Sequence, residues 1–91
     1  MDPHTVEGAR ARLIAIVNRL LGPGAAPAEP FPAKRQLSDL GVSSLKMVNL
    51  MLAVEVEFDI AIPQAEITPE NFHSLESVEA LVARTLRAAS G

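Results

Sequence analysis

Two adjacent serines, Ser43 and Ser44, are the residues of this chain whose positions most suggest chemistry. They occur in "LGVSSLKMVNL", where a glycine-containing turn leads into an apolar stretch typical of a helix. A serine nucleophile needs a base within hydrogen-bond reach, and the stretch is not a G-x-S-x-G elbow. The two histidines are His4, near the N-terminus, and His73, at the end of an expected short helix. We therefore do not expect a serine hydrolase.

Other kinds of reactive or metal-binding site are not indicated either. The chain has no cysteine, so it has no thiolate nucleophile, disulfide or cysteine-based zinc site. No spacing of His, Asp or Glu resembles a metal site, and no P-loop or dinucleotide-binding glycine pattern occurs. Lys34 and Arg35 could dock a phosphate, although a basic pair in a loop is usually only solubilising. By itself the chain is expected to catalyse nothing and to hold no metal.

Composition and charge narrow the class of protein further. Nearly half of the 91 residues are apolar, at 48%, so a packed core is expected. The net charge is −3, and every charged residue from Met47 to Ala83 is acidic, which argues against nucleic-acid binding. The N-terminus has no apolar segment typical of a signal peptide, and no apolar run could span a membrane. We expect a soluble, cytoplasmic and monomeric protein.

The elements that must position the serines are helices separated by a long loop. The first helix is expected at about residues 3–21, with Asp2 as its N-cap and Pro3 in the first helical position. Prolines and glycines in "GPGAAPAEPFP" then predict a loop over residues 22–43, broken by a turn near Leu37–Leu40. The second helix is expected at about residues 44–58.

Two more helices are expected after an extended connector, "DIAIP", in which Ile60 and Ile62 point inward. Thr68 and Pro69 predict a short helix over about residues 69–73, anchored by Phe72. Ser74 can cap a last helix over about residues 75–87. The chain is predicted to be one all-α domain of residues 1–91, an antiparallel four-helix bundle with three longer helices, one short third helix and a long first crossover.

The second helix has more apolar surface than one buried face requires. Its expected core face comprises Met47, Leu50, Met51, Val54 and Phe58. A second apolar face comprises Leu45, Val48, Leu52 and Val56, with Ser44 at its N-terminal edge. This second face could be buried by neighbouring helices, or it could be an exposed docking surface or a mouth through which an apolar chain enters the core. The pattern alone leaves these alternatives open.

The stretch "LSDLGVSSLKMVNLMLAVEVEFDIAIP" resembles the core motif of acyl carrier proteins. Leu37, Asp39, Leu40 and Gly41 match the turn of that family, Ser44 and Leu45 match its Ser-Leu pair, and Glu55, Glu57, Phe58, Asp59, Ile60, Ile62 and Pro63 match its helix end and connector. The resemblance is dense from residue 37 to residue 63, and the order of helices extends it over most of the chain.

The resemblance implies a function that needs no catalytic residue in this chain. In the family, the matching serine receives 4′-phosphopantetheine from coenzyme A through a phosphopantetheinyl transferase, and the thiol of this arm carries cargo as a thioester. It implies Ser44 as the attachment residue. Partner enzymes would dock on the adjacent helix, here on Ser43, Leu45, Lys46, Val48, Asn49, Leu52 and Val56. A loading ligase and a downstream transferase or synthase are the further partners implied.

The chain departs from the family at Ser43, where an aspartate is usual, and at positions along the helix where fatty-acid carriers have acids. Ser43 can still cap the helix, but basic partner surfaces lose part of their electrostatic complement. A specialised carrier is therefore expected. The Ser-Ser pair and the "LML…E…FDI" stretch resemble stand-alone aminoacyl carrier proteins, which a dedicated ATP-dependent ligase loads. Acyl carriers of specialised lipid or polyketide biosynthesis, and an unmodified helical interaction subunit, remain as alternatives.

Overall fold

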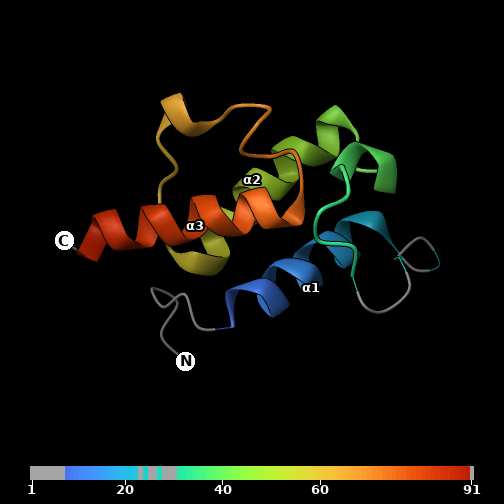
Figure 1. Ribbon diagram of the computed structural model, residues 1–91, viewed down its shortest axis with the longest axis horizontal. Helices are drawn as coiled ribbons and strands as arrows, with labels where there is room; N and C mark the ends of the chain where they lie inside the picture. The colour runs from blue at the N-terminus through green and yellow to red at the C-terminus, as the bar shows by residue number, and fades with distance from the viewer. Residues whose placement is uncertain (1–7, 23, 25–26, 28–30, 91) are drawn as a thin grey trace.

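The computed structural model describes residues 8–22, 24, 27 and 31–90. Within these residues the regular elements are all helical (Figure 1). They are, in chain order, α1 (Ala9–Leu21), the 3₁₀ helix η1 (Leu37–Leu40), α2 (Ser44–Phe58), the 3₁₀ helix η2 (Gln64–Glu66) and α3 (Leu75–Ser90). The extended pairing found in this part of the chain is one isolated antiparallel bridge between Gln36 and Ser74.

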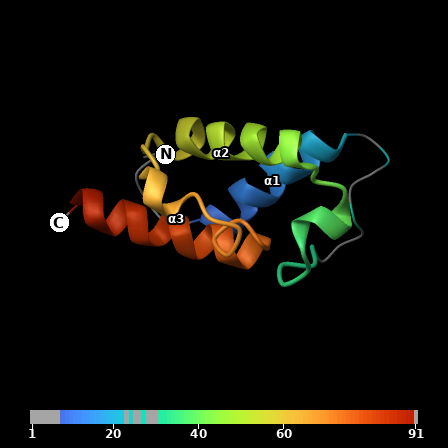
Figure 2. The same ribbon diagram turned by 90° about the horizontal axis from the view of Figure 1, so that it is seen from above.

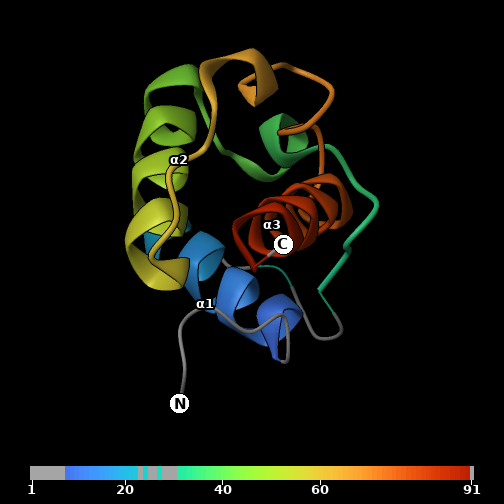
Figure 3. The ribbon, with the colours of Figure 1, turned by 90° about the vertical axis from the view of Figure 1, so that its left-hand side faces the viewer.

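The three α-helices pack around a shared core, with α1 in contact with both α2 and α3. α2 and α3 run in the same direction and α1 runs in the opposite one (Figure 2). Figure 3, which looks along α3, shows α1 and α2 on two sides of it. Because α2 and α3 are parallel, residues 59–74 must return the chain along the length of α2 before α3 begins. We call residues 59–74 the returning segment. The N-terminal ends of α2 and α3 therefore lie at the same end of the molecule.

The core is almost entirely aliphatic, as the composition predicts. Its fully buried side chains include Leu13, Ile16 and Val17 of α1, Leu50, Val54 and Phe58 of α2, and Leu75, Val78, Leu81 and Val82 of α3. Burying a side chain of this size contributes about 1.5–3 kcal/mol. Ile62 and Phe72 bring the returning segment onto the same core, in agreement with the inward positions predicted for them.

The start of α1 differs from the prediction of a helix from about residue 3. α1 begins at Ala9, and the preceding residue, Gly8, has a positive φ of 73°, in the left-handed region. This conformation is incompatible with a continuous right-handed helix through residue 8. The cap and first-turn roles predicted for Asp2 and Pro3 lie outside the described residues.

The short helix expected over residues 69–73 is not present, and this prediction is wrong. Thr68 does cap the segment, because its Oγ1 accepts a hydrogen bond from the backbone N–H of Asn71 (3.2 Å) and its carbonyl accepts one from Phe72 (3.2 Å). The turn stops there because the carbonyl of His73 accepts the backbone N–H of Leu37 (2.9 Å) and Ser74 caps the next helix. The short helical element of this segment is η2, five residues earlier.

The end of the first crossover is attached to the start of α3. Besides the bond from Leu37 to His73, the backbone N–H of Glu76 donates to the carbonyl of Ala33 (3.0 Å). Buried Ser74 caps α3, with its Oγ accepting the backbone N–H of Ser77 (3.2 Å). These bonds hold residues 33–37, which precede the two serines, against the start of α3.

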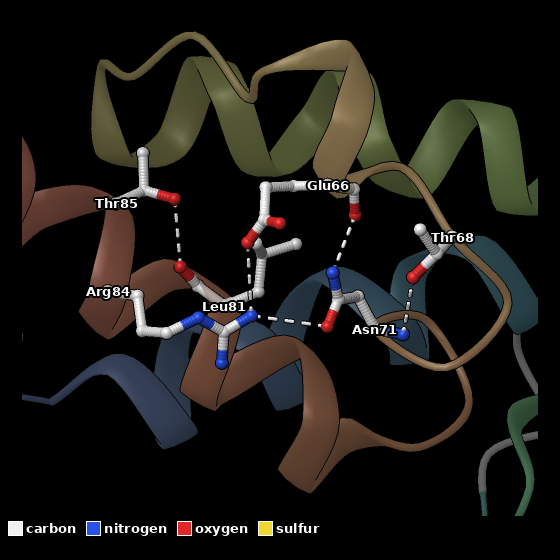
Figure 4. Close-up of polar contacts among 6 residues, drawn as sticks. All are labelled: Glu66, Thr68, Asn71, Leu81, Arg84 and Thr85. Carbon is white, nitrogen blue, oxygen red and sulfur yellow. Dashed lines mark hydrogen bonds and ion pairs between the residues drawn. The ribbon is translucent and has the colours of Figure 1, made fainter.

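The returning segment is held on α3 by a set of polar contacts (Figure 4). The Arg84 guanidinium lies 3.3 Å from Glu66 Oε1 and donates to Asn71 Oδ1 at 3.1 Å, while Asn71 Nδ2 donates to the Glu66 carbonyl at 2.7 Å. An exposed ion pair contributes little, about 0–1 kcal/mol, but here three groups form one network. The network fixes residues 66–71 against α3.

Candidate functional site

Ser43 and Ser44 occupy two different positions at the start of α2. Ser43 is the N-cap, with extended backbone (φ −69°, ψ 172°), and its Oγ accepts the backbone N–H of Lys46 at 3.3 Å. Ser44 is the first residue of the helix and is exposed. No side-chain hydrogen bond of Ser44 occurs with any residue that the structure describes. One serine is thus used by the fold, whereas the other is exposed and has no such structural role.

The turn before the serines depends on Gly41. Its φ is 108°, which an L side chain rarely adopts, and it ends η1 by donating its N–H to the carbonyl of Ser38 (3.2 Å). A Cβ at this position would lie 3.3 Å from Leu21 Cδ2, so the turn also packs closely on the end of α1. The N–H of Val42 bonds the Leu37 carbonyl (3.0 Å), and its side chain is buried. The turn before α2 is therefore held by its close packing on Leu21 of α1 and by the hydrogen bond and burial of Val42.

The second apolar face of α2 is exposed, which excludes one of the three alternatives left open by the sequence. Leu45 is 73% exposed, Val48 51%, Leu52 50% and Val56 82%. Burial by neighbouring helices is excluded for these side chains, whereas Leu50, Val54 and Phe58 of the core face are fully buried. Four large apolar side chains on successive turns of one helix form a stripe that begins at Ser44. We call these four side chains the outer face of α2.

The two acidic residues of α2 are both engaged within the protein. Glu55 Oε2 accepts the backbone N–H of Ile62 (2.8 Å) and so holds the start of the returning segment. Glu57 Oε2 accepts a bond from Arg12 Nε (2.8 Å), while Arg12 Nη2 donates to the Glu57 carbonyl (2.6 Å) and its guanidinium lies 4.2 Å from the centre of the Phe58 ring. The polar residues of α2 beside the outer face are neutral or basic. Asn49 is exposed and Lys46 is half-buried.

A groove of about 610 Å³ opens beside Ser44, between the first half of α2 and the returning segment. Met47 and Met51 of α2 line one wall, and Ile67, Phe72 and His73 line the other. Gln36 also lines the groove and pairs with the His73 ring, at 3.0 Å between Gln36 Nε2 and His73 Nε2. Ser44 itself is part of the lining, so the exposed serine stands at the edge of both the groove and the outer face.

The sequence located the α2 side of this site but not the opposite wall. Ile67, Phe72 and His73 lie more than twenty residues after Ser44, and His73 was interpreted only as a polar helix-end residue. The parallel arrangement of α2 and α3 brings them to Ser44. A sequence signal did exist, since a connector of 16 residues between two helices is long enough to return along one of them.

Two further features of the described residues bear on function. No helix among them is long and apolar enough to cross a bilayer. No group of three or more His, Cys, Asp or Glu side chains in this part of the chain could hold a metal ion.

Comparison with known families and proteins gives consistent matches over this region. The family described as "phosphopantetheine attachment site" matches residues 11–85. The chain is 48% identical over 81 residues to aminoacyl carrier protein 1 of Bradyrhizobium diazoefficiens, covering 89% of each chain. It is 42% identical over 88 residues to aminoacyl carrier protein 2 of the same organism, covering 97% of this chain and 98% of that one.

Solved structures give a matching result for the fold. One is a crystal structure of Bradyrhizobium japonicum glycine:[carrier protein] ligase complexed with glycylated carrier protein, matched with a TM-score of 0.64 and 49% identity over 80% of this chain and 97% of that one. The second contains the same ligase with its cognate carrier protein and an analogue of glycyl adenylate, with a TM-score of 0.67 and 49% identity over 84% and 97% of the two chains.

Proposed function

Because the chain belongs to the phosphopantetheine-dependent carrier proteins, as a member of the aminoacyl carrier subgroup, we propose that Ser44 is the residue that carries the 4′-phosphopantetheine arm. The chain is not an enzyme but a substrate of other enzymes, and its cofactor is this covalent arm. What we propose beyond the family is the attachment residue, the cargo, the loading enzyme and the surface on which that enzyme docks.

The observation that carries the proposal for Ser44 is its exposure as the first residue of α2, next to a capped neighbour. The first N–H groups of a helix have no partner within the helix. Ser43 takes the N–H of Lys46, and the N–H groups of Ser44 and Leu45, also in the first turn, could then bind the phosphodiester that would form. The helix dipole favours the same negative charge.

Attachment is a phosphoryl transfer that Ser44 undergoes and another enzyme catalyses. The Ser44 oxygen forms a bond with the phosphorus that bears the pantetheine arm of coenzyme A. The bond from that phosphorus to the bridging oxygen breaks, and adenosine 3′,5′-bisphosphate leaves. The serine proton passes to a base supplied by the phosphopantetheinyl transferase, because the serine has no base of its own among the described residues.

We propose an amino acid as the cargo, with glycine as the first candidate, and a dedicated ATP-dependent ligase as the loading enzyme. Support comes from the solved carrier proteins that are 49% identical to this chain and are complexed with a glycine:[carrier protein] ligase. Such a ligase joins the amino acid to AMP with release of pyrophosphate. The arm thiolate then attacks the carbonyl carbon, the thioester forms and AMP leaves. A downstream transferase or synthase would take the amino acid from the arm.

We propose that this ligase docks on the outer face of α2 and on the polar residues beside it, Ser43, Lys46 and Asn49. Exposed apolar side chains in one stripe are typical of an interaction surface. Because both carboxylates of α2 are engaged internally, the partner surface should be apolar and not basic.

The experiment that tests Ser44 is an intact-mass measurement after incubation with coenzyme A and a broad-specificity phosphopantetheinyl transferase. The unaltered chain should gain the mass of one phosphopantetheine, and Ser44→Ala should gain none. Ser43→Ala is the matched control, since it changes the neighbouring serine in the same way and should still be modified. A mass gain that is retained in Ser44→Ala and lost in Ser43→Ala would move the attachment site to Ser43. If neither the unaltered chain nor any variant gained mass, the alternative of an unmodified helical interaction subunit would be favoured.

The cargo is tested on the holo protein, with a ligase of the kind found in the solved complexes, ATP and a panel of amino acids. Formation of a hydroxylamine-sensitive glycyl adduct supports the proposal. If the holo protein purified from its source instead carries an acyl or polyketide chain, the specialised acyl carrier is correct.

A further inference from the structure

We infer that Arg19 of α1 and Lys46 of α2 form a positively charged edge of the docking surface, and that this edge binds acidic side chains of the loading ligase. The inference rests on the proposed docking of a ligase on the outer face of α2. It goes beyond that proposal by adding a residue of α1 and by giving the sign of the charge on the partner. We call these two residues the basic edge.

Two contacts fix how α1 lies along α2. Near the start of α1, the Arg12 guanidinium bonds Glu57 in the last turn of α2, at 2.8 Å. At the end of α1, Leu21 packs on the turn that leads into α2, where a Cβ at Gly41 would lie 3.3 Å from Leu21 Cδ2. Because the two helices are antiparallel (Figure 2), the last turns of α1 lie beside the first half of α2.

Helical spacing places the two cations on the sides of α1 and α2 that face each other. Arg19 follows Arg12 by seven residues, about two turns, and so lies on the same side of α1. Lys46 precedes Glu57 by eleven residues, about three turns, and so lies on the same side of α2. The seam that carries a cation and an anion at one end therefore carries two cations at the end next to Ser44.

The charges of the basic edge have no counterpart within the part of the chain that the structure describes. Three other arginines each pair with a glutamate, whereas Arg19 and Lys46 form no ion pair there. The acid on this side of α2, Glu57, is already bonded to Arg12. Like charges on neighbouring helices repel each other, so the fold gains no stability from placing them together. A carboxylate supplied by a partner would compensate both.

The basic edge is accessible and continuous with the outer face of α2. Arg19 is exposed, and half-buried Lys46 follows Leu45, the first side chain of the outer face. A lysine in such a position covers apolar surface with its methylene groups and keeps its ammonium group in water. Protein interfaces have an apolar centre and a polar rim. A ligase that covers the outer face and reaches Ser44 therefore meets both cations at the rim, where Asp or Glu is the complementary residue.

Charge reversal tests the basic edge in the ligase loading experiment, with each variant first converted to the holo form and checked by intact mass. Arg19→Glu and Lys46→Glu should each lower kcat/KM at least about threefold at low salt, because attraction at the rim becomes repulsion and association slows. The deficit should shrink to less than about 1.5-fold between about 0.02 M and about 0.5 M salt, since exposed charges are then screened. Arg19→Gln removes the attraction without adding repulsion and should have a smaller effect.

Arg87→Glu is the matched control. Arg87 is exposed in the last turn of α3, as Arg19 is in the last turn of α1. Both substitutions therefore change the net charge equally and place an acid at the negative end of a helix dipole. The end of α3 and the start of α2 lie at opposite ends of the molecule (Figure 1). Loading of Arg87→Glu should stay close to that of the unaltered chain at both salt concentrations.

Several results would overturn the inference. Equal losses in all three charge reversals would show only an effect of net charge, and unchanged or faster loading of Arg19→Glu or Lys46→Glu would show that the ligase presents no acids there. A loss that persists at the higher salt concentration would point to a structural defect instead of a charge. If the unaltered holo chain is not loaded, the proposed function itself fails, whereas normal loading of the unaltered chain and of every variant contradicts the basic edge alone.

Discussion

The two apolar faces of α2 are alike in sequence and opposite in environment. Leu50 and Leu52 are the same residue two positions apart, yet Leu50 is fully buried and Leu52 is half exposed. Hydrophobicity alone therefore does not reveal which face holds the fold together. The difference arises because α1 packs on one side of α2, while the returning segment meets α2 at the groove and at Glu55 and leaves the outer face exposed.

The largest expected effect on stability belongs to the core face. Leu50→Ala should lower the free energy of unfolding by about 2–5 kcal/mol, because it removes buried methyl groups and leaves a cavity. Urea denaturation followed by circular dichroism measures the change. A loss of less than about 1 kcal/mol would mean that the core face is less tightly packed than its burial indicates.

An intermediate effect is expected at Ser43, the residue that caps α2. Ser43→Ala should cost about 1 kcal/mol, because the backbone N–H of Lys46 loses its cap. Ser43→Asp restores a capping oxygen and should keep the original stability, which makes it the control for the same denaturation experiment. Equal destabilisation by both substitutions would show that the cap does not account for the change.

The smallest stability effect is expected on the outer face. Leu52→Ala should change the free energy of unfolding by less than about 1 kcal/mol, since the side chain is already half in water. Its effect should instead be on loading: if Leu52 is a central contact of the ligase, kcat/KM should fall at least about fivefold, the equivalent of about 1 kcal/mol.

Paired measurements on Leu50→Ala and Leu52→Ala would sharpen the contrast, because the substitution is identical. Loading of Leu50→Ala should be measured where that variant is still folded, and its kcat/KM should stay close to that of the unaltered chain. A Leu52→Ala protein that is much less stable yet loads normally would reverse the assignment of the two faces.

Much of this arrangement was accessible from the sequence, because it depends on local patterns. The bounds of α2, the cap at Ser43 and the inward side chains of the connector follow from spacing and from capping preferences. The resemblance to acyl carrier proteins, which is confirmed by the family match, added the role expected of Ser44.

The parts that could not be predicted depend on contacts between distant residues. The short helix at 69–73 was wrong because the extended pairing of Gln36 with Ser74 and the hydrogen bond from Leu37 to His73 interrupt it. In the sequence, Arg12 is one more polar residue of an amphipathic helix. In the structure, it stacks on Phe58 and binds Glu57. Exposure of the outer face also could not be decided, because it depends on where the returning segment runs.

The internal engagement of Glu55 and Glu57 has a consequence for how this carrier would share a cell with others. A partner that selects its carrier by acids along this helix would find one oxygen of each carboxylate already bonded within the protein, and would meet Lys46 two residues after Ser44 instead. Discrimination of this kind is a difference between two affinities and can be achieved by withholding a contact. We therefore expect these two carboxylates, which are used for folding, also to reduce crosstalk between this carrier and enzymes that serve acidic ones.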